Sequence, residues 1–129
     1  PATVPDDAML GAQGVSAEAY IAIRRTDSGP QVALDSLSLF TAQNAKVSNK
    51  AFAVAKEKYG QEALRYGQAN ATALLQDKDV AMARVELVQA NNKTPWRRQD
   101  KVDLPKVDWL TDDMRKKTVY VGQGVLELK

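Results

Sequence analysis

The feature that most constrains the fold of this chain is an alanine-rich segment over residues 41–91. It holds twelve alanines, two glycines and no proline, a composition typical of helix. A seven-residue recurrence of apolar side chains keeps one stripe of a long helix facing a partner, and every seventh residue here is apolar or aromatic. The series is Ala45, Phe52, Tyr59, Tyr66, Ala73, Val80 and Leu87.

The length of this segment raises the question of whether it is one helix. At 1.5 Å per residue it would be roughly 70 Å long, longer than a compact domain of 129 residues is wide. It is therefore either extended and supported by other chains or folded back. The candidate breaks are Gly60, Gly67 and residues 76–79, whose aspartates are suitable N-caps for a second helix over residues 80–90. Apolar side chains also alternate over residues 80–89, so a strand is the alternative there.

The N-terminal part of the chain is less regular. Residues 1–17 combine proline, glycine and small side chains and predict an extended arm. Residues 20–23 are β-prone and are followed by a turn signal at residues 26–30. The apolar spacing of residues 31–40 is mixed, and we assign them to the start of the helical body.

The C-terminal part predicts a loop-rich element. Residues 92–110 are charged, with two tryptophans, and residues 111–117 predict a short helical turn. Residues 118–121 and 125–128 flank a Gly-Gln-Gly triplet, which is a β-hairpin signal. The sequence as a whole predicts one mainly α domain over residues 1–129. It consists of an extended N-terminal arm (1–17), a long helix or helical hairpin (31–91), and a C-terminal element (92–129) ending in a small β-hairpin.

The absence of cysteine and histidine limits the chemistry of the chain. It excludes disulfides, thiolate metal sites, thiol catalysis and histidine as a general base. The carboxylate pairs at residues 77/79 and 112/113 favour helix capping over calcium binding, because the further ligands of a calcium loop are missing. No familiar motif of nucleophilic catalysis or phosphate binding occurs. We therefore expect a protein that is not an enzyme and holds no cofactor or metal.

No apolar run approaches the roughly 18–20 residues of a membrane span, so no span is expected. The first residue, Pro1, fits either removal of an initiator methionine or processing of a longer precursor. The charge is polarised along the chain, with a net of −3 over residues 1–40 and +3 over residues 92–129. Such polarity suits head-to-tail contact between copies, among other arrangements.

The candidate interface residues come from the helical stripe. Tyr-Gly-Gln occurs at residues 59–61 and again at residues 66–68, and its glycines would let two helix backbones approach closely. The partner is either another subunit or a returning helix of the same chain, in which case the stripe is the domain core. Trp109 is expected in a core, and Trp96 at an interface. The predicted interface set is Phe52, Tyr59, Gly60, Tyr66, Gly67 and Trp96.

The basic clusters give an alternative. Arg97, Arg98, Arg115, Lys116 and Lys117 would contact phosphates in a nucleic-acid-binding or packaging accessory protein. Aspartates interleave with them, and the net charge of only +2 gives little support to a polyanion partner. We expect instead a structural subunit of a larger assembly, such as a virion, a secretion or appendage complex, or another multi-subunit complex. It would work through helix–helix packing between protein subunits, as a homo-oligomer or in a multi-subunit complex.

Overall fold

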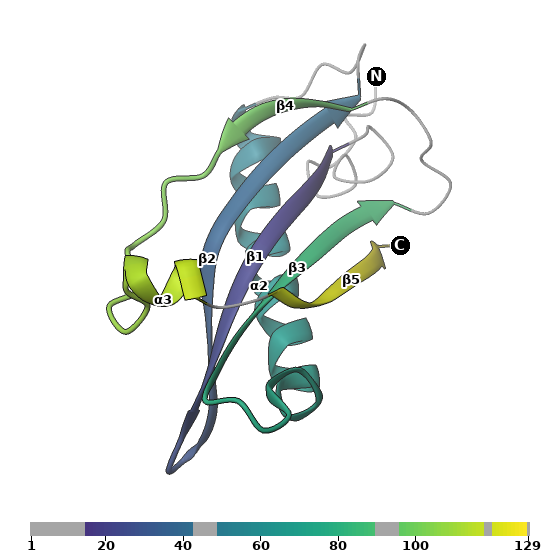
Figure 1. The fold of residues 1–129 in the computed structure, drawn as a ribbon. Coiled ribbons are helices and arrows are strands. Elements are labelled where there is room, and N and C mark those ends of the chain that lie inside the picture. The colour runs from purple at the N-terminus through teal and green to yellow at the C-terminus, as the bar shows by residue number, and fades with distance from the viewer. Residues whose placement is uncertain (1–14, 43–48, 90–95, 118–119, 129) are drawn as a thin grey trace, which may run out of the picture.

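A five-stranded β-sheet forms the centre of the chain in its computed structural model (Figure 1). The structure describes residues 15–42, 49–89, 96–117 and 120–128. In chain order the elements are β1 (Val15–Thr26), β2 (Gly29–Ala42), α2 (Asn49–Leu75), β3 (Val80–Gln89), β4 (Trp96–Lys101), α3 (Asp112–Lys117) and β5 (Tyr120–Leu128).

The strands lie in the order β4-β2-β1-β3-β5. Neighbours are antiparallel except β3 and β5, which are parallel. The long helix α2 covers one face of the sheet, and the short helix α3 lies on the other side, next to β2 (Figure 1). The prediction of a mainly α fold is therefore wrong, because a sheet and not a second helix packs against α2.

The predicted helical body is wrong at its N-terminal end. The turn signal at residues 26–30 is confirmed: Thr26 pairs with Gly29 across a tight turn, and Gly29 has the positive φ of 112° that glycine tolerates. The chain then continues as β2, antiparallel to β1, so residues 31–40 are strand. Residues 15–17 of the predicted arm also belong to β1, and residues 1–14 lie outside the described residues.

The predicted break at residues 76–79 is confirmed. Helix α2 ends at Leu75, and Gln76 takes a φ of 52°, the left-handed conformation that commonly closes a helix. The amide of Gln76 still donates to the carbonyl of Thr72 (3.0 Å). The second helix expected over residues 80–90 is wrong, because residues 80–89 form strand β3, which was the alternative there. The glycines at 60 and 67 do not interrupt α2, which at 27 residues is about 40 Å long.

The C-terminal predictions are mixed. The short helix over residues 111–117 is confirmed as α3, but part of the predicted loop forms β4. The predicted β-hairpin is wrong, because β5 is one strand that pairs in parallel with β3. Its two glycines lie inside the strand, where Gly122 is opposite Ala83 and Gly124 opposite Val85.

The main core lies between α2 and the sheet. Odd-numbered residues from Val15 to Ile23 of β1 and from Ala81 to Leu87 of β3 are buried there, whereas Ala22 and Met82 belong to the core on the opposite face, the period-2 pattern of a strand. On β2 the register shifts between the partners of Tyr20 and Ile21, because Asp35 is an extra residue in the strand. This bulge lets Leu34 and Leu37 both pack on the helix side.

A smaller core lies on the opposite face, under the chain that leads to α3. Buried Ala22 of β1 and Met82 of β3 contact buried Val107 and Leu110 there. The partly buried Trp109 packs against the same cluster, in agreement with its predicted core role. Apolar contacts on both faces therefore fix the sheet between α2 and the segment before α3.

Candidate functional site

The glycines predicted to form a close-packed seam do so within the chain. Gly60 and Gly67 are buried on the side of α2 that faces the sheet. A Cβ added at Gly67 would lie 2.7 Å from both Ile21 Cδ1 and Val32 Cγ1, closer than carbon atoms pack. At Gly60 the nearest atom, Leu34 Cδ2, would be 3.5 Å away, an ordinary contact.

The aromatic members of the stripe lie beside these glycines. Tyr59 is fully buried in the main core, while Phe52 and Tyr66 are partly buried and pack against it. The prediction of a helix–helix seam is corrected accordingly: the stripe forms the core of this domain, and the surface that it packs against is the chain's own sheet. The partner site expected on Tyr59 and Gly67 is already occupied by β1 and β2.

Tyr59 also joins α2 to the start of β1. Its hydroxyl donates a hydrogen bond to the backbone carbonyl of Val15, and both residues are fully buried. Burial raises the pKa of Tyr59 well above its usual value of 10. The phenol is therefore held in its neutral form as a hydrogen-bond donor, a structural role.

A charged network lies on the sheet face opposite α2. Arg84 of β3 donates through Nε to Glu18 Oε2 of β1 (2.9 Å), and its Nη1 contacts Glu86. Burial alone would lower the pKa of Arg84, but hydrogen bonds to Glu18 and Glu86 outweigh it and raise that pKa. One arginine therefore holds two carboxylates on neighbouring strands, which ties β1 to β3.

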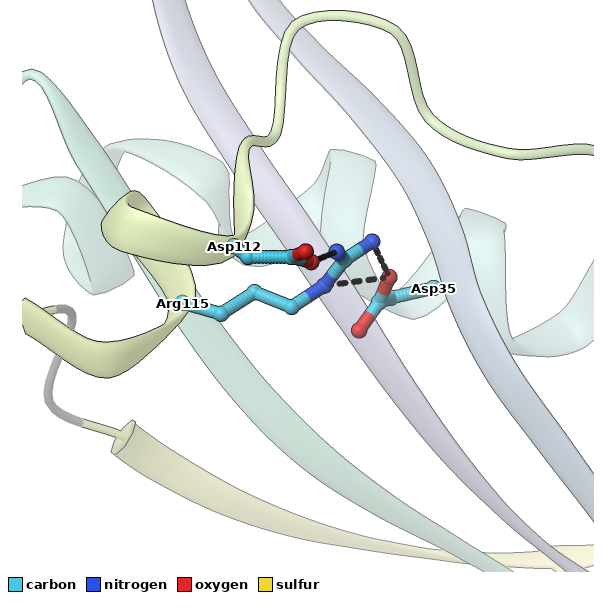
Figure 2. A network of polar contacts seen from close by, with 3 residues as sticks. All are labelled: Asp35, Asp112 and Arg115. Carbon is cyan, nitrogen blue, oxygen red and sulfur yellow. Dashed lines mark hydrogen bonds and ion pairs between the residues drawn. The ribbon is translucent and has the colours of Figure 1, made fainter.

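A second network fastens α3 to the sheet (Figure 2). Arg115 donates through Nε and Nη2 to Asp35 Oδ1 at 3.3 and 2.8 Å, and through Nη1 to Asp112 Oδ1 at 2.8 Å. The hydrogen bond to Asp35 is the main cause that raises the pKa of Arg115. Asp35 is the bulged residue of β2, so an irregularity in the strand supplies the carboxylate that docks α3.

This network bears on the predicted nucleic-acid contacts. Arg115 already engages two carboxylates of its own chain, whereas Lys116 next to it is exposed. Arg97, Arg98 and the predicted interface residue Trp96 lie on β4, and Lys117 ends α3; their side chains are outside the described part of the structure. Strand β4 and helix α3 occupy different regions of the molecule (Figure 1), so the fold does not merge the two basic clusters.

A shallow groove of about 450 Å³ lies between β2 and the segment before α3. Its lining is mostly apolar and includes Leu34, Pro105 and Trp109. The guanidinium of Arg24 lies 4.9 Å from the centre of the Trp109 ring, a cation–π contact. We assign the groove a packing role, because its lining residues Ala33, Val107 and Trp109 belong to the smaller core or pack against it.

The two edges of the sheet are the feature that the sequence did not reveal. Among the described strands, β4 pairs only with β2, and β5 pairs only with β3. The outer backbone N–H and C=O groups of an edge strand form a template for another strand. The edges differ in charge, since β4 has three basic residues and one acidic residue in six, and β5 has a single acidic residue in nine. Sequence reasoning missed both because it placed β4 in a loop and β5 in a hairpin.

Comparisons with known protein families, with curated proteins and with solved structures gave no match to this chain. Neither helix in the described ranges combines the length and the hydropathy that crossing a membrane requires. Within the same ranges, no three Asp or Glu residues gather closely enough to hold a metal ion. We take the two sheet edges, β4 and β5, each paired on one side only among the described strands, as the candidate functional site.

Proposed function

We propose that this protein is a non-enzymatic structural subunit of a larger protein assembly. The observation that carries the proposal is the sheet itself, which ends on both sides in strands paired on one side only among the described residues. The free backbone groups of an edge strand are a template on which a strand of another chain can pair. Assembly would give both edges the second neighbouring strand that they lack among the described residues.

The mechanism differs from the helix–helix packing expected from the sequence. The apolar stripe of α2 is buried against the chain's own sheet in the main core, so we assign the contact between subunits to strands. A neighbouring strand that overlaps the six residues of β4 would add roughly six backbone hydrogen bonds in an antiparallel ladder. These bonds are independent of side-chain identity, which suits a repetitive structural contact.

The nucleic-acid alternative has less support from the geometry. Arg115, one of its five predicted contacts, is held by Asp35 and Asp112. Phosphate binding depends on free cationic side chains and weakens steeply with salt. Strand pairing depends mainly on backbone hydrogen bonds and should persist at high ionic strength.

The test is the molar mass of the purified chain, measured by size-exclusion chromatography with multi-angle light scattering at low and at 1 M salt. The proposal predicts a mass that is a multiple of the monomer mass, grows with protein concentration and persists at high salt. A chain that stays monomeric at concentrations up to about 1 mM, where contacts of only −4 kcal/mol become visible, would overturn it.

A further inference from the structure

We infer that copies of this chain join head to tail, with β4 of one copy pairing antiparallel to β5 of the next. This inference rests on the proposed structural function and names the partner, a second copy, and the surface that it binds. Three observations carry it: the directions of the two edge strands, their charges and their lengths.

The strand directions make this pairing antiparallel. Strand β4 is antiparallel to β2, and β2 is antiparallel to β1, so β4 and β1 run in the same direction. Strand β3 is antiparallel to β1 and parallel to β5, so β5 runs in the opposite direction. Two copies placed side by side in the same orientation therefore bring β5 of one against β4 of the other as antiparallel neighbours.

The charges favour unlike edges over like ones. Strand β4 carries Arg97, Arg98 and Lys101 against Asp100, a net of +2, whereas β5 carries only Glu127, a net of −1. Pairing β4 with β4 would bring two positive strands together, and pairing β5 with β5 would bring two negative ones together. Of the three pairings, only that of β4 with β5 brings opposite charges together. Like charges across an interface disfavour the other two.

The overlap is sufficient for a ladder. The nine residues of β5 can cover all six of β4. Because the two surfaces in contact are different, the same contact repeats at the free edge of each added copy. The result is a continuous sheet across copies, which closes into a ring if the rotation between copies permits and otherwise grows as a filament.

The experiment reverses the charge of each edge. Glu127→Lys makes β5 positive, and the double variant Arg97→Glu/Arg98→Glu makes β4 negative. Either variant alone places like charges across the contact and should weaken self-association by about tenfold or more. The triple variant restores opposite charges and should recover most of the association, measured by light scattering and sedimentation velocity.

A matched control and a local readout complete the design. Glu57→Lys makes the same charge change at an exposed position of α2, on the helix rather than on a sheet edge, and should leave association unchanged. Amide hydrogen exchange of the wild-type chain should slow in both residues 96–101 and residues 120–128 as the protein concentration rises.

The outcomes separate this inference from the proposed function. If the charge-reversal variants form oligomers of the same mass as the wild type, the head-to-tail contact is overturned and the structural role is left in place. Concentration-dependent protection of β5 but not β4 would also overturn it, since it indicates a two-fold β5–β5 dimer. A monomer at every concentration would overturn both proposals.

Discussion

The close approach of α2 to the sheet at Gly67 gives a sharp test of the packing, because the chain contains its own control. Gly60 and Gly67 stand in identical Tyr-Gly-Gln triplets one heptad apart, and both lie in the interior of α2. Alanine at either position gains about 1 kcal/mol of helix propensity. The two sites differ in the space that each offers to the new methyl group.

The expected magnitudes follow from the contacts. At Gly60 the methyl would meet Leu34 Cδ2 at an ordinary 3.5 Å, so Gly60→Ala should stabilise the chain by about 1 kcal/mol. At Gly67 it would meet Ile21 and Val32 at 2.7 Å. Valine is stiff about χ1 and cannot easily turn away, and overpacking of this kind costs about 1–3 kcal/mol. Gly67→Ala should therefore be less stable than Gly60→Ala by about 1–3 kcal/mol.

The assay is urea unfolding followed by circular dichroism at one fixed protein concentration, so that association contributes equally to each variant. Val32→Ala removes Cγ1 and Cγ2 of Val32, two of the three atoms that the new methyl group would meet, and leaves Ile21 Cδ1. On that background Gly67→Ala should cost about 1 kcal/mol less than in the wild type, as a double-mutant cycle would show. Equal stabilisation by alanine at both glycines would refute the close approach.

Three further perturbations test the contacts around the sheet. Tyr59→Phe should cost about 1–2 kcal/mol because the buried carbonyl of Val15 loses its donor. Because folding raises the pKa of Tyr59 above 10, its contribution is full below pH 10 and is lost as the pH rises beyond that value. Above pH 10 the free energy of unfolding, measured by urea titration, should therefore fall more steeply with pH for the wild type than for the phenylalanine variant. The same pH dependence in both proteins would contradict this. Arg115→Ala should cost about 1 kcal/mol, discounted for its partial exposure, and should speed amide exchange in α3 selectively; exchange that is unchanged there would show that Asp35 does not dock the helix. Leu110→Ala should cost about 2–4 kcal/mol because its side chain is fully buried in the smaller core, and a loss below 1 kcal/mol in urea unfolding would contradict that packing.

Local features of the chain were readable from the sequence. The turn at residues 26–30, the break after α2 and the alternation in residues 80–89 all depend on neighbouring residues. They appear in the structure as the β1–β2 turn, the positive φ of Gln76 and strand β3. The glycine at 67 was correctly assigned to a close approach, although the partner is a sheet.

Strand β2 was missed because of its bulge. The extra residue Asp35 moves the apolar positions from the even series of Val32 and Leu34 to the odd series of Leu37 and Leu39. The resulting spacing is neither 2 nor 3.6 and resembles the irregular start of a helix. The bulge is an irregularity in the pairing of β2 with β1, and its Asp35 is bound by Arg115 of α3. Neither contact is visible in a local sequence window.

The predicted heptad stripe was too long, also because a local pattern was read without its tertiary context. Its members Phe52, Tyr59 and Tyr66 do face the core, but Ala73 is exposed on α2 and Val80 lies in β3. Alanine-rich sequence meets an apolar heptad easily, so the pattern continued past the end of the helix.

The edge strands depend on pairing between distant parts of the chain. Strand β4 consists largely of charged residues, which have weak strand preference, and it forms because β2 offers a neighbour. Strand β5 contains two glycines that resemble a turn, yet it pairs with β3 from more than thirty residues away. The candidate site could not be predicted because it consists of these two strands.

The most direct test of assembly through the sheet edges uses cysteine cross-linking, which is clean because the chain has no cysteine of its own. Gln99→Cys on β4 is combined with cysteines placed in turn along β5, beginning with Gln123→Cys. Within one copy these edges are four strand spacings apart, about 19 Å, far beyond the roughly 7 Å that a disulfide can bridge. Mild oxidation should therefore produce a ladder of covalent dimers, trimers and larger species for at least one pair, while each single-cysteine variant stays monomeric on a non-reducing gel. Dimers from single-cysteine variants, or no cross-link at any β5 position, would contradict head-to-tail assembly through β4 and β5.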